Sequence, residues 1–288
     1  MIIPTSAFKL TQDEDILQLY EIMETLNVYF MIINHCADNQ CRWSLSQFKM
    51  FADKFPIFQI TTNCFLIDEE NVVNFLHIVA GIKNCRVLIH DPLKSSIVSY
   101  RFTLKDVELM VKLDIKVTEI ESSMLKMDGK IVTLLKFADL FRQMKHLEDF
   151  YFSYGDFEMN PPPMEKLIDI PIRLISLMNF KIQKETIKNV VEILLQMKCL
   201  EELYMEANLN EGYKLTVEDF ALFQNLPVKT LHLEAFELRK DNIDDFRRIM
   251  RGMKIRFING FRGNLVNRGE DLEISVQRFG PENCYVTI

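Results

Sequence analysis

The 288-residue sequence has no run of about 18 apolar residues, so no membrane-spanning helix is predicted. Its first residues, MIIPTSAFKLTQDED, lack the charged stretch and long apolar core of a signal peptide. Its six cysteines include no CxxC pair. In a chain of this size, scattered cysteines indicate free thiols in a reducing compartment. We therefore expect an intracellular protein, cytoplasmic or nuclear, and keep a secreted disulfide-bonded protein as the disfavoured alternative.

Catalytic motifs are also absent. The histidines do not form HExxH or another recognised ligand spacing, and GxSxG, GxxxxGK[ST] and GxGxxG do not occur. His35 beside Cys36 has the residue types of a nucleophilic pair, but no surrounding motif supports that role. Paired acids such as Glu201-Glu202 are more typical of a solvated surface than of general acid–base catalysis. We predict a protein that is not an enzyme and that binds no metal and no cofactor.

Basic residues are in the minority, because 41 acidic and 34 basic residues give a net charge of −7. General nucleic-acid binders usually carry an excess of Lys and Arg, so this balance argues against one and permits a basic protein partner. One basic stretch comprises Arg247, Arg248, Arg251, Lys254, Arg256, Arg262 and Arg268. We interpret it as a solvated helix face, with contact to phosphates or to an acidic partner as the alternative.

The sequence does contain an internal repeat. An aromatic or apolar residue, a spacer and an aliphatic residue recur every 56 to 59 residues. These anchors begin at Phe8, Phe65, Met124, Phe180 and Phe236. A second set lies between them, at Phe55, Leu113, Ile170 and Leu226. Such regular self-similarity predicts a solenoid, in which each period of about 57 residues holds two strand–helix units.

Each unit joins a short strand to an amphipathic helix. In ETIKNVVEILLQM, apolar residues recur at helical spacing, namely Ile187, Val190, Val191, Leu194 and Leu195. Alternate residues of the strand point toward this apolar helix face. No unit can bury both faces alone, so stacked neighbours must supply the core.

The strand segments follow the pattern LxxLxLxxNxL. IPIRLISLMNFKI places Ile172, Ile175, Leu177, Phe180 and Ile182 at its apolar positions, whereas CRVLIHDPL from Cys85 fits worst. Over almost the whole chain the units therefore resemble the leucine-rich-repeat family, and their two alternating types are similar to ribonuclease-inhibitor-like horseshoes. The resemblance implies an α/β solenoid with a parallel sheet on its concave face and helices on its convex face.

Two features qualify this resemblance. The bend positions hold Phe, Ser, Gly, Asn or Cys instead of a regular Asn, so no Asn ladder is expected. Degenerate repeats rich in Phe, Ile, Met and Lys also resemble those of nematode F-box-associated proteins, although no F-box-like helical segment precedes the first repeat.

Domain boundaries follow from the repeat. We assign residues 1–265 to a solenoid of about ten degenerate units, which form five double repeats, and residues 266–288 to a C-terminal cap. In the cap, LEISVQRF and CYVTI are expected to form two strands around the turn GPEN. The first unit begins inside a repeat without a polar cap, so we expect that a protein partner covers it, or that the protein is a fragment or a degenerate member of the family.

The residues between the core positions of each strand are expected to line the concave surface. The first strands offer an apolar patch, which comprises Phe30, Ile32, Val87 and Ile89. Later strands offer a mostly acidic floor with tyrosines, which comprises Glu119, Glu121, Asp149, Tyr151, Glu202, Tyr204, Glu206, His232 and Glu234. Tyrosine and charge on a rigid sheet are typical of protein-binding sites.

These patterns predict a non-enzymatic scaffold or adaptor that binds a protein partner through its concave face, forms a stable complex and shows no turnover. The alternative is a non-catalytic subunit of a larger enzyme complex, such as a ubiquitin ligase or a nucleic-acid-processing assembly. Binding of nucleic acid through the basic stretch is disfavoured by the net acidic charge.

Overall fold

The structure is a computed structural model, and its packing divides the chain into two units, residues 1–147 (unit 1) and residues 148–288 (unit 2). The residues that it describes are 13–25, 31–33, 43–89, 100–126, 131–153, 165–180, 184–207, 215–233, 243–252, 257–260 and 263–266. Residues 1–12, which include the strand expected before Phe8, lie outside this set, as do residues 267–288 of the predicted cap.

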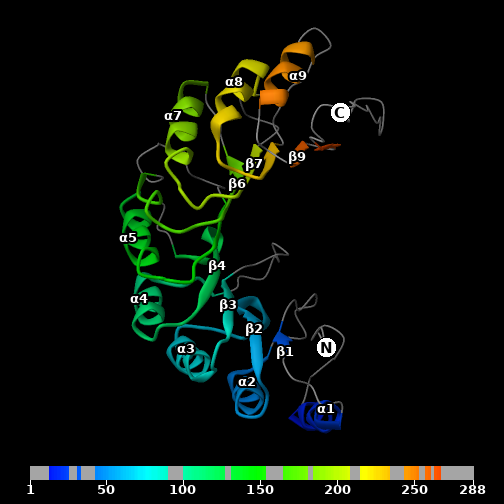
Figure 1. The fold of residues 1–288 in the computed structure, drawn as a ribbon. Helices are drawn as coiled ribbons and strands as arrows, with labels where there is room; N and C mark the ends of the chain where they lie inside the picture. The colour runs from blue at the N-terminus through cyan, green and yellow to red at the C-terminus, as the bar shows by residue number, and fades with distance from the viewer. Residues whose placement is uncertain are drawn as a thin grey trace. The chain divides into compact units, whose positions relative to one another are not determined.

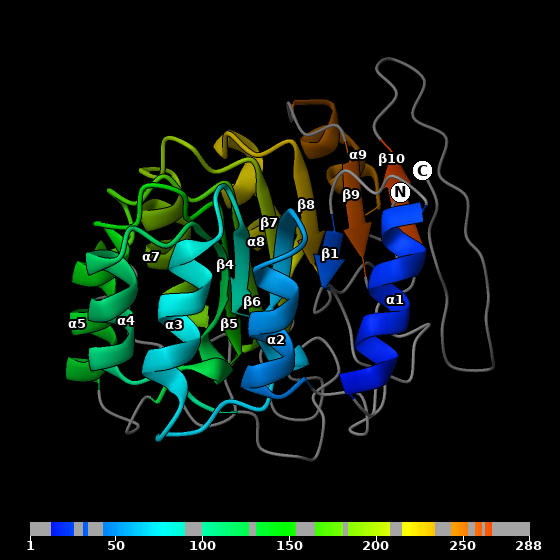
Figure 2. The ribbon, with the colours of Figure 1, turned by 90° about the horizontal axis from the view of Figure 1, so that it is seen from below.

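Unit 1 alternates helices and strands along the chain. Its helices are α1 (Asp13–Thr25), α2 (Leu45–Ala52), α3 (Val72–Gly81), α4 (Leu104–Lys112) and α5 (Ile131–Phe141). Its strands are β1 (Met31–Ile33), β2 (Ile57–Thr61), β3 (Arg86–Ile89) and β4 (Val117–Glu121). The four strands pair in parallel and in sequence order. Helices α2 to α5 form a row along one side of strands β2 to β4 (Figures 1 and 2).

Local sequence explains where these helices begin. Ser44 caps α2 and Thr103 caps α4, each in a capping box with the residue three positions later, Gln47 or Asp106. The side chain of each cap accepts a hydrogen bond from a backbone N–H that the helix leaves unpaired. The Gln or Asp side chain in turn accepts a hydrogen bond from the backbone N–H of the cap.

The turns into β3 and β4 use residues that tolerate a left-handed backbone. Asn84 has φ 61° and Asp114 has φ 51°, and short polar side chains adopt this region more readily than most. Each residue lies just after a helix and just before the next strand. The Nζ of Lys116 donates to Oδ1 of Asn84 at 2.7 Å, which connects the two successive turns.

A larger element recurs in unit 1 at about the predicted period. Strands β2 and β4 each run directly into a 3-10 turn, Thr62–Cys64 or Ser122–Met124. The residue after each turn forms a parallel bridge to the residue before a helix cap: Phe65 pairs with Trp43, and Leu125 pairs with Phe102. All four side chains are buried. The two 3-10 turns begin at Thr62 and Ser122, which are 60 residues apart.

Aromatic side chains form much of the core of unit 1. The ring centroid of Phe48 lies 4.4 Å from that of Phe65 and 5.5 Å from that of Phe75. Trp43 meets Phe51 edge to face at 4.6 Å. Phe65 is one of the repeat anchors found in the sequence, and its buried position explains why an aromatic residue occupies that bend.

Unit 2 continues the alternation. Its described helices are α7 (Lys184–Leu194), α8 (Val217–Leu222) and α9 (Ile243–Gly252). Its strands are β5 (Asp149–Ser153), β6 (Leu174–Phe180), β7 (Glu202–Ala207), β8 (Thr230–Leu233), β9 (Phe257–Gly260) and β10 (Gly263–Val266). Strands β5 to β9 pair in parallel and in sequence order. In Figure 1, α7 and α8 lie on one side of these strands.

The last strand departs from the expected arrangement. We predicted parallel strands throughout residues 1–265, but β10 turns back and pairs antiparallel with β9, with Gly263 opposite Gly260.

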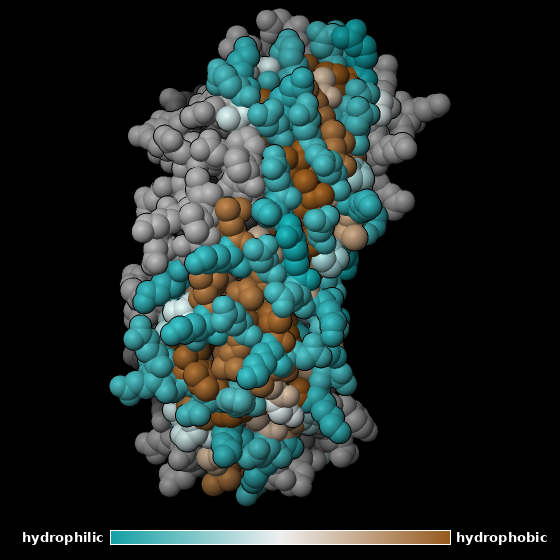
Figure 3. Space-filling model, turned by 90° about the vertical axis from the view of Figure 1, so that its left-hand side faces the viewer, coloured by the Kyte–Doolittle hydropathy of each residue, from teal (hydrophilic) through white to brown (hydrophobic). Residues whose placement is uncertain are grey.

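The helix of unit 2 that we analysed from its sequence, α7, buries the predicted face. Ile187, Val190, Val191 and Leu194 are all buried, together with Ile193. Leu195, just after the last residue of α7, is instead 40% exposed. Figure 3 views the helix-bearing side, where polar side chains cover most of each unit and apolar side chains are visible between them.

The structure confirms the coarse prediction of an α/β fold in which parallel strands carry helices on one side. Among the described residues, no helix combines the length and apolarity needed to span a bilayer.

Candidate binding site

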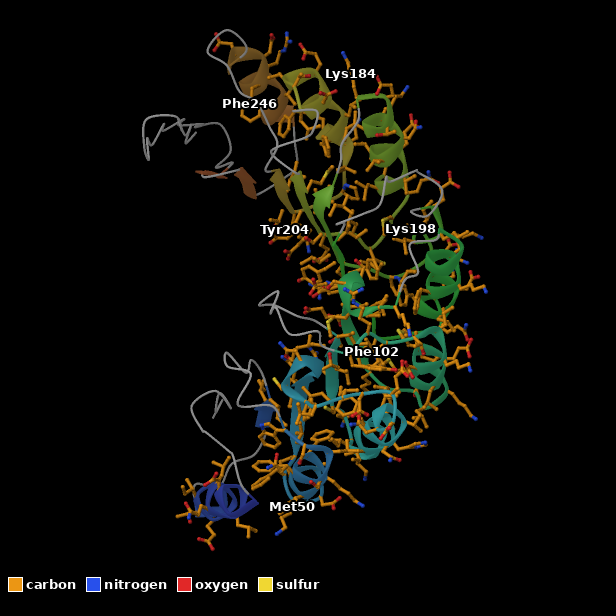
Figure 4. All side chains as sticks on the ribbon, turned by 180° about the vertical axis from the view of Figure 1, so that it is seen from behind. Met50, Phe102, Lys184, Lys198, Tyr204 and Phe246 are labelled. Atoms are coloured by element: carbon orange, nitrogen blue, oxygen red, sulfur yellow. The ribbon has the colours of Figure 1, made fainter. Side chains whose placement is uncertain are left out.

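The open face of unit 2 is the side of strands β5, β6 and β7 that faces away from the helices. Along each strand the side chains alternate between the two sides. Phe150, Ile175, Leu177, Leu203 and Met205 are buried on the helix side. Figure 4 shows Tyr204 on the opposite side of β7, away from α7 and Lys198.

Strand pairing brings the residues of the open face into two rows. In the first row, Tyr151 of β5 lies beside Ser176 of β6, and Ser176 lies beside Tyr204 of β7. In the second row, Asp149, Leu174 and Glu202 occupy the equivalent places. These six residues are called the tyrosine slot below. Their register in the structure is the register that the repeat pattern predicted.

The centre of the tyrosine slot is its smallest side chain. Ser176 is only 6% exposed, whereas Tyr151 and Tyr204 on either side are half-buried. Among the described residues, none is hydrogen-bonded to the Ser176 hydroxyl. A small residue between two large ones leaves a depression on a sheet, since side chains stand roughly perpendicular to it.

The carboxylates of the slot differ from those just outside it. Glu148 and Glu201 each pair with Arg173, whose guanidinium nitrogens lie 3.5 Å and 3.4 Å from their carboxylate oxygens. Glu201 also lies 2.8 Å from the Nζ of Lys229. Hydrogen bonding to Lys229 lowers the pKa of Glu201. Arg173 and Lys229 therefore pair with carboxylates outside the slot.

Asp149 and Glu202 form no ion pair with any described residue. Burial raises the pKa of Asp149 to about 6, and the carboxylates of Glu148 and Glu202 add to this effect while Arg173 opposes it. The hydroxyl of Tyr204 donates to Oε2 of Glu202 at 3.4 Å, so Glu202 extends toward the tyrosine row. Burial, followed by the charge of Glu202, raises the pKa of Tyr204.

The register predicted for residues 85–93 is wrong. We expected Val87 and Ile89 on the exposed face, but they are 1% and 0% exposed and belong to the core. Val87 pairs with the buried Ile60 on one side and with the buried Val117 on the other. Arg86 and Leu88 occupy the opposite side of β3, so the apolar patch expected from Val87 and Ile89 does not exist.

Glu121 is a second correction. It was expected on the open surface, but it is 3% exposed, and Ser123 donates to its Oε1 at 2.8 Å. The 3-10 turn that follows β4 brings this partner within reach. Glu119 and Ile32 are half-buried, on β4 and β1 of unit 1, and so do not belong to the tyrosine slot.

Some predicted residues are only partly described. Glu206 lies on β7 next to Met178, and His232 lies on β8 next to Tyr204, so both extend the expected rows at the level of the backbone. Phe30 and Glu234 lie outside the described residues, as do His35 and Cys36. Sequence reasoning placed Leu174 and Ser176 on this face but did not select them as site residues. Alignment of the repeats places Ser176 between two tyrosines, and this position was the feature of the sequence that could have identified it.

Other parts of the described chain show fewer features of a binding site. A groove of about 670 Å³ lies between α2 and α3, lined by residues that include Lys49, Asp53 and His77. Within the described residues, no group of three or more His, Cys, Asp or Glu side chains is placed to hold a metal ion. In the predicted basic stretch, the guanidinium of Arg248 lies 2.7 Å from the carboxylate of Asp245.

Comparison with known proteins supplies no identity. The sequence matches no protein-family model, and no curated protein matches it.

Proposed function

We propose that the chain is a leucine-rich-repeat solenoid that acts as a non-enzymatic scaffold or adaptor and binds a protein partner through the tyrosine slot. The period of about 57 residues, the parallel strands in sequence order and the helices on one side support the solenoid. Three free cysteines among the described residues, Cys64, Cys85 and Cys199, support an intracellular location.

The tyrosine slot carries the binding part of the proposal. Tyrosine offers a large, rigid contact area with a polar tip, and it is enriched among residues that dominate binding energy. Here two half-buried tyrosines lie beside two half-buried carboxylates that form no ion pair with any described residue. Unpaired, partly buried carboxylates are unfavourable in isolation, and a partner that supplies positive charge relieves that cost.

Affinity purification from native extract tests this proposal. The tagged full chain is compared with the double variant Tyr151→Ala/Tyr204→Ala and with Leu195→Ala, which removes an exposed apolar side chain from the helix-bearing side. We expect specific proteins to be recovered with the wild type and with Leu195→Ala, and to fall by more than about tenfold with the double variant. Equal recovery with all three proteins would remove the main support for the tyrosine slot.

A further inference from the structure

Deepening the proposed function, and resting on it, we propose that the tyrosine slot holds the guanidinium of an arginine on the protein partner. The plane of the guanidinium lies over Ser176 between Tyr151 and Tyr204, and its N–H groups donate to the carboxylates of Asp149 and Glu202.

The spacing of the strands fits a flat cation. Neighbouring strands lie about 4.8 Å apart, so a group midway over β6 is about 4.8 Å from each flanking strand. Tyr151 and Tyr204 are on those flanking strands, directly beside Ser176. A cation is attracted to an aromatic face within about 6 Å of its centre, and a planar guanidinium can stack against two rings at once.

Ser176 is the second independent feature of the slot. Its side chain is nine-tenths buried, is hydrogen-bonded to no other described residue, and lies on the same side of β6 as the slot because Ile175 and Leu177 are buried on the other side. A hydroxyl between two larger side chains can accept a hydrogen bond from an N–H group that enters the space between them. A guanidinium carries five such N–H groups, more than any other side chain.

The carboxylates of the slot also favour a positively charged ligand. Among the described residues, Arg173 and Lys229 pair with Glu148 and Glu201 and form no ion pair with Asp149 or Glu202. Glu202 reaches toward the tyrosine row through its bond from Tyr204. Half-buried Leu174, between Asp149 and Glu202, provides an apolar surface for the methylene groups of an arginine side chain.

The probe is a fluorescein-labelled glycine–serine peptide of eight residues that contains two arginines, titrated into the full chain and followed by fluorescence anisotropy at low salt. Matched peptides carry citrulline, which has the shape of arginine without its charge, or lysine, which has the charge without the plane. We expect the arginine peptide to bind about tenfold or more tightly than the citrulline peptide, and several-fold more tightly than the lysine peptide.

Protein variants locate the site. Glu202→Gln should weaken binding of the arginine peptide about tenfold by removing a charged acceptor. Glu192→Gln, on the helix-bearing side, makes the same change in net charge and should have no effect. Ser176→Val should fill the slot and weaken binding at least as much, and circular dichroism checks that the variant is folded. Tyr204→Phe keeps the aromatic ring and should retain most of the affinity that Tyr204→Leu loses.

Several results would overturn the inference: no binding of the arginine peptide, equal binding of the citrulline or lysine peptide, or equal weakening by Glu192→Gln and Glu202→Gln. The last result would indicate a general attraction to an acidic protein. If these tests fail while Tyr151→Ala/Tyr204→Ala still loses its partners in purification, the proposed function stands and only the arginine ligand is wrong. If the purification result also fails, both proposals fall.

Discussion

Units 1 and 2 use the same strand–helix alternation but differ in the side chains between the core positions. In unit 1, the last residues of β2 and β4 are buried, with Thr61 2% exposed and Glu121 3% exposed, and Glu119 is half-buried. In unit 2, two tyrosines, Tyr151 and Tyr204, and two carboxylates, Asp149 and Glu202, are half-buried within β5 and β7. The two units therefore share the strand–helix alternation, and the proposed binding residues lie in unit 2.

The strands of unit 1 end in a recurring way. There, β2 and β4 run into 3-10 turns, and Phe65 and Leu125 then bridge to Trp43 and Phe102. In unit 2, β6 and β7 extend to Phe180 and Ala207. Pairing of β5 with β6 and of β6 with β7 aligns Tyr151, Ser176 and Tyr204.

The largest expected effect is the difference in unfolding free energy between a core variant and a variant of the tyrosine slot. Phe48→Ala removes a fully buried ring from the aromatic cluster of unit 1 and should lower the free energy of unfolding by about 3–5 kcal/mol. Tyr204→Ala, in the slot of unit 2, should lower it by less than about 1.5 kcal/mol, because its side chain is only half-buried. Denaturant titrations of both variants measure the contrast. Similar losses would contradict the division into core and binding residues.

The register of β3 gives a smaller effect. Val87→Ala should lower the free energy of unfolding by about 2 kcal/mol, because Val87 packs in the core between Ile60 and Val117. The matched change Leu88→Ala should have less than half that effect, because Leu88 is on the other side of β3 and half-buried. A larger loss for Leu88→Ala than for Val87→Ala would instead support the register predicted from the sequence.

The smallest effect concerns Asp149 and pH. Its folded pKa of about 6 lies above the unfolded value of about 3.9, so its ionisation destabilises the folded state as pH rises from about 4 to about 6. Asp149→Asn should therefore raise the free energy of unfolding at pH 7.5 by up to about 1 kcal/mol, a figure reduced for solvent screening of a half-buried group. Below about pH 4, where Asp149 is protonated, the variant should have the same free energy of unfolding as the wild type.

Urea titrations at pH 3.5, 5 and 7.5 measure this dependence, with Glu192→Gln as the control for net charge. The charged groups around Asp149 are Glu148, Arg173 and Glu202. A stabilisation that is the same at all three pH values would show that ionisation of Asp149 is not its source.

The sequence predicted more of unit 2 than of β3. In ELYME, Leu203 and Met205 alternate with polar residues, and in LISLM the polar Ser176 stands between Ile175 and Leu177, so the pattern indicates which side chains face the core. In RVLI the residues Val87, Leu88 and Ile89 are all apolar, and either register satisfies the alternation. Only pairing with Ile60 and Val117 decides between the two, and pairing is a property of the folded sheet.

The sequence also predicted only part of the tyrosine slot. Tyr151, Ser176 and Tyr204 are 25 and 28 residues apart in the chain, and the repeat placed each on the correct side of its strand. That Ser176 would be buried between them, and that Arg173 would be occupied by Glu148 and Glu201, depends on side-chain packing across three strands. Such long-range neighbours leave no mark on local periodicity.

The most direct test of the central claim is photo-crosslinking to the recovered partner. A benzoylphenylalanine is placed at Thr230, which lies beside Glu202 on the open face of unit 2, and separately at Leu195 on the helix-bearing side. We predict a cross-link to the partner from position 230 and none from position 195. A cross-link from position 195 alone would show that the partner binds the helices, and would contradict the account.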